Sequence, residues 1–415
     1  MQQSTQMIPR GSSDLVAEAL ADTRAVLLMG ARQTGKSTLA EQLVREAPSA
    51  STSNLDEAPL REAATNDPEG FIAGLQRPAF IDEVQRGGPD LFLAIKRAVD
   101  EDKSPGQFLL TGSANVLRSR QVWEALTGRV EIVTLWPLAQ AEIEGVSSNF
   151  VDSLFAGEPP AITDAPKGRE ALKDRLTAGG YPEARVRNPG RRDRWFDSYL
   201  RTTLERDIQD ISQAHKLQQM PGLLRLVAAQ AANLFVPSKL SQRIGLHRET
   251  VESHVDLLEA IFLVHRLRAW APGIGQREIR HSKAYVVDTG LLLYLLGADE
   301  KRLLEDDQVT GKALENFIAM EVVRLAEWSR HTPAIYHYRR SADEVDLVLE
   351  NRAGEICAIE AKASVTLREK DWRQLAKLRD ARPDSFRCGV LFYAGEKTVP
   401  LGDRLFAVPL SGLWT

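Results

Sequence analysis

One short motif constrains this chain more than any other feature. Residues 30–37 read GARQTGKS, in which two glycines bracket four residues and a Lys-Ser pair follows the second glycine. The motif comes directly after the apolar run Arg24–Met29 and opens a helix-like stretch at Lys36–Ala47. Glycines let such a loop curl so that its backbone N–H groups converge on phosphate oxygens at a helix N-terminus. The sequence therefore predicts a phosphate-binding loop between a buried strand and a helix.

The same motif predicts ATP and Mg²⁺ as ligands. Lys36 is placed to reach the β- and γ-phosphates, and the hydroxyl of Ser37 can ligate Mg²⁺. The backbone of the loop would surround the phosphates. We therefore expect nucleotide contacts from the following residues: Gly30, Ala31, Arg32, Gln33, Thr34, Gly35, Lys36, Ser37 and Thr38.

Two adjacent carboxylates follow a second apolar run. The run Pro78–Ile81 leads directly into Asp82 and Glu83. Asp82 is expected to hold Mg²⁺ together with Ser37, and Glu83 to polarise the attacking water. The alternative is a solvated acidic strand end, but the position after a phosphate loop favours the catalytic interpretation.

A third apolar run, Gln107–Leu110, leads into the polar segment Thr111-Gly112-Ser113-Ala114-Asn115. A polar side chain here would lie between the first strand and the acidic strand, within reach of a γ-phosphate. Ser113 is the first choice for this catalytic contact, with Thr111 and Asn115 behind it. The alternative is that Ser113 only caps the helix that follows.

Arg129 stands directly before a fourth run, Val130–Leu135. From this position its guanidinium could be presented to the transition state of phosphoryl transfer. An ordinary surface arginine on a turn is an equally good interpretation.

Strand-like runs that alternate with helix-like stretches predict an α/β fold with a parallel sheet. At 415 residues, the chain is long enough for two or three domains. The expected division is an ATPase domain at 14–160, a helical region at 161–300 with a winged helix at about 222–285, and a third domain at 301–415. Residues 1–13 are polar and are expected to form a frayed tail.

Composition excludes several classes of protein. With 43% hydrophobic and 27% charged residues, the chain can bury real cores and is not disordered throughout. Its 57 acidic and 53 basic residues nearly balance, which argues against a non-specific polycation. Cys357 and Cys388 are too few for a disulfide framework. The N-terminus lacks a signal pattern and the apolar run Gly290–Gly297 is too short to span a bilayer, so we expect a cytoplasmic protein without a membrane partner.

The middle of the chain offers two candidate DNA contacts. Ser238–Val251 reads as helix, Gly turn and second helix, with His247 and Arg248 near the start of the second helix. That helix also carries several acidic residues, which oppose the approach of phosphates, so a purely structural role stays open. An arginine-rich stretch at 185–206 is the better electrostatic candidate, although such a helix is often only a solvated face.

Three C-terminal segments carry carboxylates in an order that suggests metal chemistry. Glu315 lies on an amphipathic helix, Asp346 enters an apolar strand, and Glu360 and Lys362 share one side of the next strand because alternate residues share a face. Glu315, Asp346 and Glu360 could hold Mg²⁺ against a scissile phosphate, and Lys362 could orient the attacking water. Gln374 could add a polar contact. The alternative is an exposed Glu–Lys pair with unrelated acids. This set resembles the PD-(D/E)xK nuclease core.

The chain as a whole resembles bacterial and archaeal AAA+-type ATPases that carry a C-terminal domain of unknown function. The matching segments are GARQTGKSTL, AFIDEVQ, LLTGSAN, LTGR and KAYVVDTGL, and the resemblance covers about Asp14 to Gly395. It implies an ATPase sheet followed by a helical region, a winged helix and a nuclease-like fold. It also implies that Arg129 serves the nucleotide of a neighbouring subunit, and hence a homo-oligomer.

The expected function is therefore that of an ATP-hydrolysing protein that binds DNA and cleaves it at a Mg²⁺-dependent C-terminal site. Two alternatives remain open at this stage. The chain could be an ATP-dependent switch whose nuclease-like domain only docks a partner, or a DNA-binding regulator that does not cut.

Overall fold

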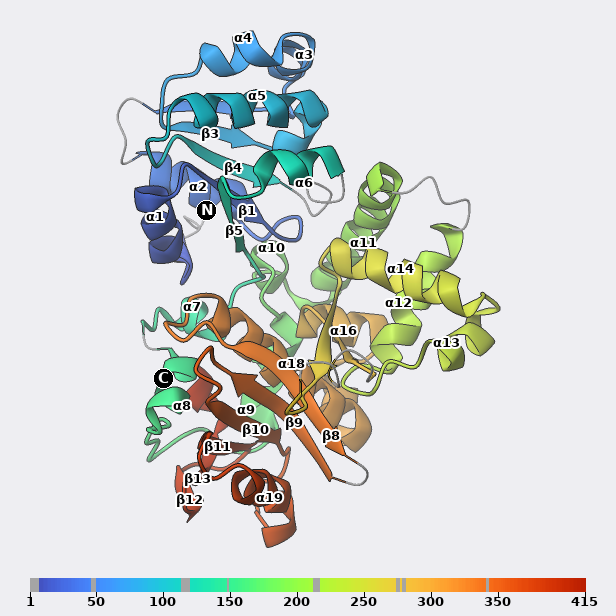
Figure 1. Ribbon diagram of the computed structural model, residues 1–415. Helices are drawn as coiled ribbons and strands as arrows, with labels where there is room; N and C mark the ends of the chain where they lie inside the picture. Colours follow the sequence, from blue (N-terminus) through green and yellow to red (C-terminus); the bar gives the residue numbers. More distant parts are fainter. Residues whose placement is uncertain are drawn as a thin grey trace, which may run out of the picture.

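Two sheets and a group of helices make up the chain (Figure 1). The computed structural model describes residues 7–45, 50–112, 120–147, 149–211, 217–273, 277, 281–340 and 343–415. The N-terminal sheet with its helices lies at the top of Figure 1, the C-terminal sheet at the bottom, and the helices of residues 189–260 at the right. Among the helices within those ranges, none is long and apolar enough to cross a membrane.

The N-terminal sheet is parallel throughout, with the order β2-β3-β4-β1-β5. Its strands are β1 (Ala25–Met29), β2 (Ser51–Asn54), β3 (Ala79–Asp82), β4 (Phe108–Gly112) and β5 (Val130–Thr134). Its helices are α1 (Ser13–Asp22), α2 (Lys36–Arg45), α3 (Ala58–Asn66), α4 (Pro68–Ala73), α5 (Gly88–Glu101) and α6 (Arg120–Leu126).

This part of the fold confirms the α/β class with a parallel sheet. The apolar runs form β1, β3, β4 and β5. Strands β1, β3 and β4 are buried throughout, because strands covered on both faces need near-continuous apolar sequence, whereas β5 lies at the sheet edge and is partly exposed. Strand β2 was not expected, since the polar sequence Ser51–Asn54 at the sheet edge carries no such signal.

The middle region is mainly helical and contains one antiparallel strand pair. Its helices are α7 (Gln140–Glu144), α8 (Phe150–Ala156), α9 (Glu170–Ala178), α10 (Pro182–Arg185), α11 (Pro189–Ile211), α12 (Met220–Ala229), α13 (Pro237–Ile244), α14 (Arg248–Ala260), α16 (Thr289–Leu296) and α17 (Glu300–Glu305). The strands are β6 (Val264–Ala269) and β7 (Lys283–Val286). Gly245 ends α13 with φ +71°, a conformation that favours glycine, so the chain turns there into α14.

The C-terminal part begins with the long helix α18 (Asp307–Glu327). It continues through β8 (Ala334–Arg340), β9 (Asp343–Glu350), β10 (Ile356–Ala361), α19 (Arg373–Ala381), β11 (Phe386–Tyr393), β12 (Val399–Gly402) and β13 (Leu405–Pro409). Strands β8, β9 and β10 form an antiparallel meander, and β11 returns parallel to β10 after α19. Short 3₁₀ turns complete the chain at Val84–Gly87, Leu217–Gln219, Glu369–Asp371 and Leu410–Trp414.

The sheet of the C-terminal part continues into the middle region. Its order is β12-β13-β11-β10-β9-β8-β6-β7, with Arg268 and Ala269 of β6 paired in parallel with Tyr336 and His337 of β8. A boundary at residue 300 therefore runs through one hydrogen-bonded sheet. Strand β7, assigned from sequence to the helical region, lies at the edge of the same sheet as β9 and β10.

Helix α18 ties the parts together through side chains that reach backbone N–H groups. Glu327 accepts from Thr134 N at the end of β5, and Glu321 accepts from Gln140 N at the start of α7. Asn316 pairs with both the N–H and the carbonyl of Val286 in β7, at 2.9 Å each. Because buried backbone groups must be paired, these bonds fix α18 against both regions.

Asp288, in the quoted segment KAYVVDTGL, has a structural role. It is fully buried, accepts from Leu291 N as the N-cap of α16, and accepts from Gly180 N at 2.6 Å. Burial raises the pKa of Asp288, an effect that Arg324 and these N–H groups oppose. The side chain thereby joins α16 to the loop after α9.

We expect Asp288→Ala to destabilise the protein by about 3 kcal/mol or more, because it leaves two buried N–H donors without an acceptor. Asp299→Ala is the matched control, since Asp299 caps α17 in the same way but is exposed. Its loss should cost about 1 kcal/mol. Urea unfolding followed by tryptophan fluorescence measures both, and equal losses would contradict the assignment.

Candidate functional site

The phosphate loop lies at the carboxyl edge of β1, between the end of that strand and α2. A Cβ on Gly30 would lie 2.2 Å from the carbonyl oxygen of Leu135, so only glycine fits beside the end of β5. Gly35 has φ +95° and Gln33 has φ +61°, which turn the backbone sharply before α2. This geometry is the curled loop that the sequence predicts at residues 30–37.

Lys36 lies inside this curl. Its side chain is buried, and Nζ donates to the carbonyls of Gly30 at 3.2 Å and Ala31 at 2.9 Å. The Thr34 hydroxyl donates to the Ala31 carbonyl at 2.9 Å and braces the same turn. The ammonium is thus held over the loop, where it can meet phosphate oxygens.

Ser37, Asp82 and Thr111 meet at one point from three elements. The hydroxyls of Ser37 and Thr111 both donate to Asp82 Oδ1, the former at 2.9 Å. Asp82 is 7% exposed, so its carboxylate is fixed beside the first turn of α2. Hydroxyl and carboxylate oxygens are the ligands that Mg²⁺ prefers. Ser37 and Asp82 therefore fit the Mg²⁺ of a bound nucleotide.

Glu83 follows in a left-handed conformation, with φ +55° and ψ +44°. Its N–H donates to Thr111 Oγ1 at 3.2 Å, and its carboxylate accepts from Gln85 Nε2. A non-glycine residue in this region is uncommon and is held there by its surroundings. The backbone therefore leaves the direction of β3 at Glu83, and Gln85 holds the Glu83 carboxylate.

The third apolar run forms β4, which lies between β1 and β3, as the sequence predicts. Thr111, a secondary candidate, donates to Asp82 Oδ1 at the end of β3 and accepts from the backbone N–H of Glu83, the next residue. Ser113 and Asn115 lie outside the described residues. Thr111 is the polar side chain that this strand demonstrably brings to the site.

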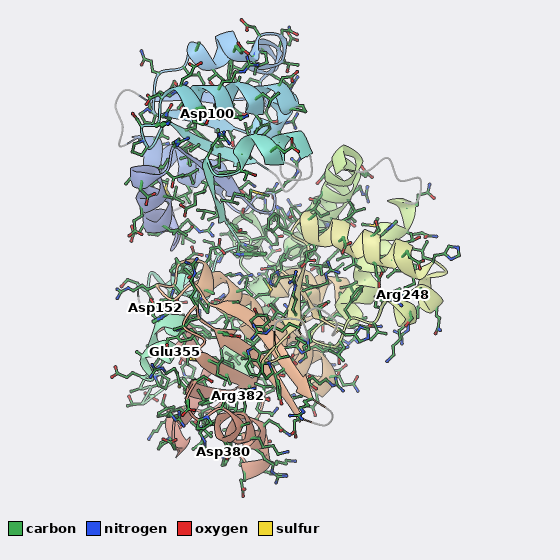
Figure 2. All side chains as sticks on the ribbon, in the orientation of Figure 1. Asp100, Asp152, Arg248, Glu355, Asp380 and Arg382 are labelled. Atoms are coloured by element: carbon green, nitrogen blue, oxygen red, sulfur yellow. The ribbon has the colours of Figure 1, made fainter. Side chains whose placement is uncertain are left out.

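Arg129 lies at the amino ends of the strands, opposite the carboxyl ends where the phosphate loop lies. It precedes β5, whose first residue, Val130, pairs with Ala25, whereas the phosphate loop follows Met29 at the far end of β1. The length of β1 from Ala25 to Met29 corresponds to about 13 Å. Arg129 makes a two-point ion pair with Asp100 of α5, at 2.7 and 2.9 Å (Asp100 is labelled in Figure 2). It does not reach the nucleotide site of its own chain.

Sequence reasoning missed Arg10, which was assigned to a frayed tail. Its guanidinium donates to the Thr34 carbonyl at 2.6 Å, to the Trp136 carbonyl at 2.7 Å and to Glu142 at 2.8 Å. The side chain is 9% exposed. Because its partners lie far along the chain, no local pattern indicates that this segment is ordered.

The C-terminal candidates also come together. Asp346 of β9 accepts from the N–H of Ala361 at 3.0 Å, which places it against the end of β10. Lys362 Nζ lies 3.4 Å from Glu360 Oε2, so the predicted common face of these two residues is present. Glu315 approaches from α18.

A residue that the sequence did not single out lies among these carboxylates. Lys283 Nζ is 2.8 Å from Glu315 Oε1, 2.8 Å from Glu344 Oε1 and 3.5 Å from Asp346 Oδ1. The hydroxyl of Tyr285 donates to the same Glu315 oxygen at 3.3 Å. Both residues belong to β7, more than thirty positions from Glu344 and Asp346, which is why local patterns gave no signal.

Burial and this lysine set the charge of the cluster. Burial raises the pKa of Glu315 to about 7, an effect that Asp346 reinforces and Lys283 opposes. Burial likewise raises the pKa of Glu360 well above its usual range, against the influence of Lys362. Burial alone would lower the pKa of Lys283. Tyr285 and the carboxylates raise this pKa by more than burial lowers it, so the ammonium stays charged.

This cluster holds a cation of the chain itself, because the ammonium of Lys283 contacts Glu315 and Asp346, two of the three expected metal ligands. Within the described ranges, no group of three or more His, Cys, Asp or Glu side chains is placed to hold a metal ion. The expected ligand set of Glu315, Asp346 and Glu360 stays a prediction.

The candidate DNA contacts of the middle region are largely neutralised. Arg248, at the outer end of α14 (Figure 2), pairs with Glu252 at 3.1 Å. In the arginine-rich stretch, Arg192 donates to the backbone carbonyls of Thr177 and Arg187, so it braces the fold. Arg191 and Arg194 of α11 are exposed.

Three family models match successive parts of the chain. Residues 22–144 match the model of an AAA domain. Residues 169–302 and 310–413 match two domains of unknown function, DUF8612 and DUF4143. Uncharacterised proteins of Mycobacterium bovis and Mycobacterium tuberculosis are each 29% identical over 411 residues, which cover 98% of this chain and 84% of theirs.

Solved structures give more distant likenesses. A Walker-type ATPase of Pyrococcus abyssi is 16% identical, with a TM-score of 0.44, over 71% of this chain and 97% of that one. A RuvB variant of Thermotoga maritima is 17% identical, with a TM-score of 0.30, over 61% and 87%. The AAA match and the loop geometry support a P-loop ATPase and nucleotide binding with a divalent metal.

Proposed function

We propose that this chain hydrolyses ATP at the edge of its N-terminal sheet and engages DNA through its middle and C-terminal parts. Lys36 would neutralise the β- and γ-phosphates, while Ser37 and Asp82 would hold Mg²⁺, which supplies charge stabilisation when bound. Glu83 would accept the proton of the attacking water. The observation that carries the proposal is the meeting of Ser37, Asp82 and Thr111 beside the curled loop.

Two substitutions test the hydrolytic site. Lys36→Ala should weaken ATP binding at least tenfold, because the loop loses the cation beside the phosphates. Glu83→Gln should keep nucleotide binding but lower turnover by about a hundredfold or more, because an amide cannot act as a base. Fluorescent nucleotide titration and phosphate release measure these effects, and wild-type turnover in Glu83→Gln would contradict the role of Glu83.

Arg129 is proposed to act on the nucleotide of a neighbouring copy. Support comes from its place at the far edge of the sheet, where it cannot serve its own chain. An Arg129→Ala chain mixed with a Glu83→Gln chain should then regain ATPase activity, because mixed assemblies pair an intact site with an intact arginine. Asp100→Ala is the control that removes only the ion-pair partner. No recovery in a verified mixed oligomer would contradict the proposal.

DNA engagement is supported by the order helix, three antiparallel strands, helix, parallel strand in α18 to β11, which agrees with the nuclease-like core that the sequence resembles. Cleavage is a second candidate function, favoured by Lys362 beside Glu360. The arrangement around Lys283 opposes it.

Charge reversal on two surfaces tests DNA engagement. Arg191→Glu with Arg194→Glu should lower affinity for DNA at least tenfold. Both arginine side chains are exposed and available to neutralise DNA phosphates, which glutamates would repel. Arg248→Glu should change it much less, because Arg248 is already paired on an acidic helix. Mobility shifts at several salt concentrations, with and without ATP, measure affinity. Absence of binding to duplex, single-stranded and branched DNA would contradict the proposal.

A further inference from the structure

The C-terminal carboxylates already hold a cation that belongs to the chain. Lys283 comes from β7 with its side chain 1% exposed, while Glu315 comes from α18 and both Glu344 and Asp346 from β9. The contacts of 2.8, 2.8 and 3.5 Å surround one ammonium with three carboxylates from two elements. A buried ammonium is stable only when its charge is met in this way.

A divalent ion would need the same oxygens. Mg²⁺ binds oxygen at about 2.0–2.1 Å, so an ion shared by Glu315 and Asp346 would lie within a few ångströms of Nζ. Two cations at that separation repel strongly where water is scarce. Occupation by Lys283 and occupation by a metal therefore exclude each other.

The lysine is also held in place by the sheet. Lys283 is the first residue of β7, pairs with Leu267 of β6 and forms a bridge with Leu234. Its backbone cannot withdraw without breaking these pairs, and its side chain has almost no path to solvent. The ammonium is thus a built-in part of the site, not a surface group that swings in.

We propose that Lys283 is the resident counter-ion of the C-terminal carboxylates and closes this site to divalent metal, which enters only when the ammonium is removed. The inference deepens the proposed function, since it takes this face to be the nuclease-like site. Its consequence is that the C-terminal part engages DNA without cutting it while Lys283 stays in place.

Metal binding by the full-length protein tests this directly. Mn²⁺ is titrated calorimetrically without nucleotide into wild type, Lys283→Met, Lys283→Arg and the double variant Lys283→Met with Asp346→Asn. Wild type and Lys283→Arg should lack the site, because both keep the positive charge. Lys283→Met should gain a Mn²⁺ site at least tenfold tighter than any that wild type shows, and the double variant should lose it.

Thermal unfolding in the same samples gives a second readout. Mn²⁺ should raise the midpoint of Lys283→Met and leave that of wild type unchanged, since a ligand stabilises only the state that binds it. Should Lys283→Met fail to fold, as judged by lost ATPase activity, Lys283→Gln takes its place, because it removes the ammonium and keeps a polar group that can pair with the carboxylates. That variant should also gain Mn²⁺ affinity.

The outcomes separate this inference from DNA cleavage. A wild type that binds Mn²⁺ through Asp346 would overturn the inference, and if it also cuts DNA the cleavage function stands. Equal gains in Lys283→Arg and Lys283→Met would overturn it too, because damaged packing and not charge would then open the site. If no variant gains Mn²⁺ affinity, the inference is overturned as well. Metal binding by Lys283→Met without DNA cutting would support the inference and contradict cleavage.

Discussion

Helix α18 is fixed by hydrogen bonds from its side chains to the backbone of other elements, and the relation between the two sheets depends on them. Glu327 and Glu321 accept from N–H groups in the segment that leaves β5, and Asn316 pairs with β7. Near the middle of the same helix, Glu315 enters the C-terminal carboxylate cluster. Helix α18 therefore contacts both the segment beside the phosphate loop and the C-terminal carboxylate cluster.

The segment after β5 is also bound to the nucleotide loop itself. Leu135 N donates to Met29 O at 2.6 Å, and Arg10 joins the carbonyls of Thr34 and Trp136. A change in the loop on nucleotide binding would thus act on the same backbone that Glu321 and Glu327 of α18 hold. These bonds supply a continuous physical path between the two sites.

The two acidic sites differ in how their charge is met. Asp82 is contacted by hydroxyls, which can donate to a carboxylate and also accept a metal beside it. Asp346 and Glu315 are contacted by the ammonium of Lys283, which offsets part of their negative charge. Carboxylates of the same type therefore meet different partners in the two sites, because a residue from another strand packs against the C-terminal set.

The N-terminal site could be predicted from sequence because its signals are local. The loop at residues 30–37 and the pair Asp82–Glu83 each follow an apolar run, and parallel strands bring their carboxyl ends to one edge. Strand β2 and Arg10 could not be predicted, since β2 is polar and the partners of Arg10 lie between 24 and 132 positions away.

In the C-terminal part, the sequence alone determined which residue types share a strand face, as with Glu360 and Lys362. Only the tertiary structure decided what fills the space between the carboxylates. Strand β7 reaches the sheet through β6 and β8, so Lys283 meets Glu315 across 32 positions of the chain. Spacing along a chain fixes the side on which a residue projects, whereas the charge that it meets depends on which distant segment packs against it.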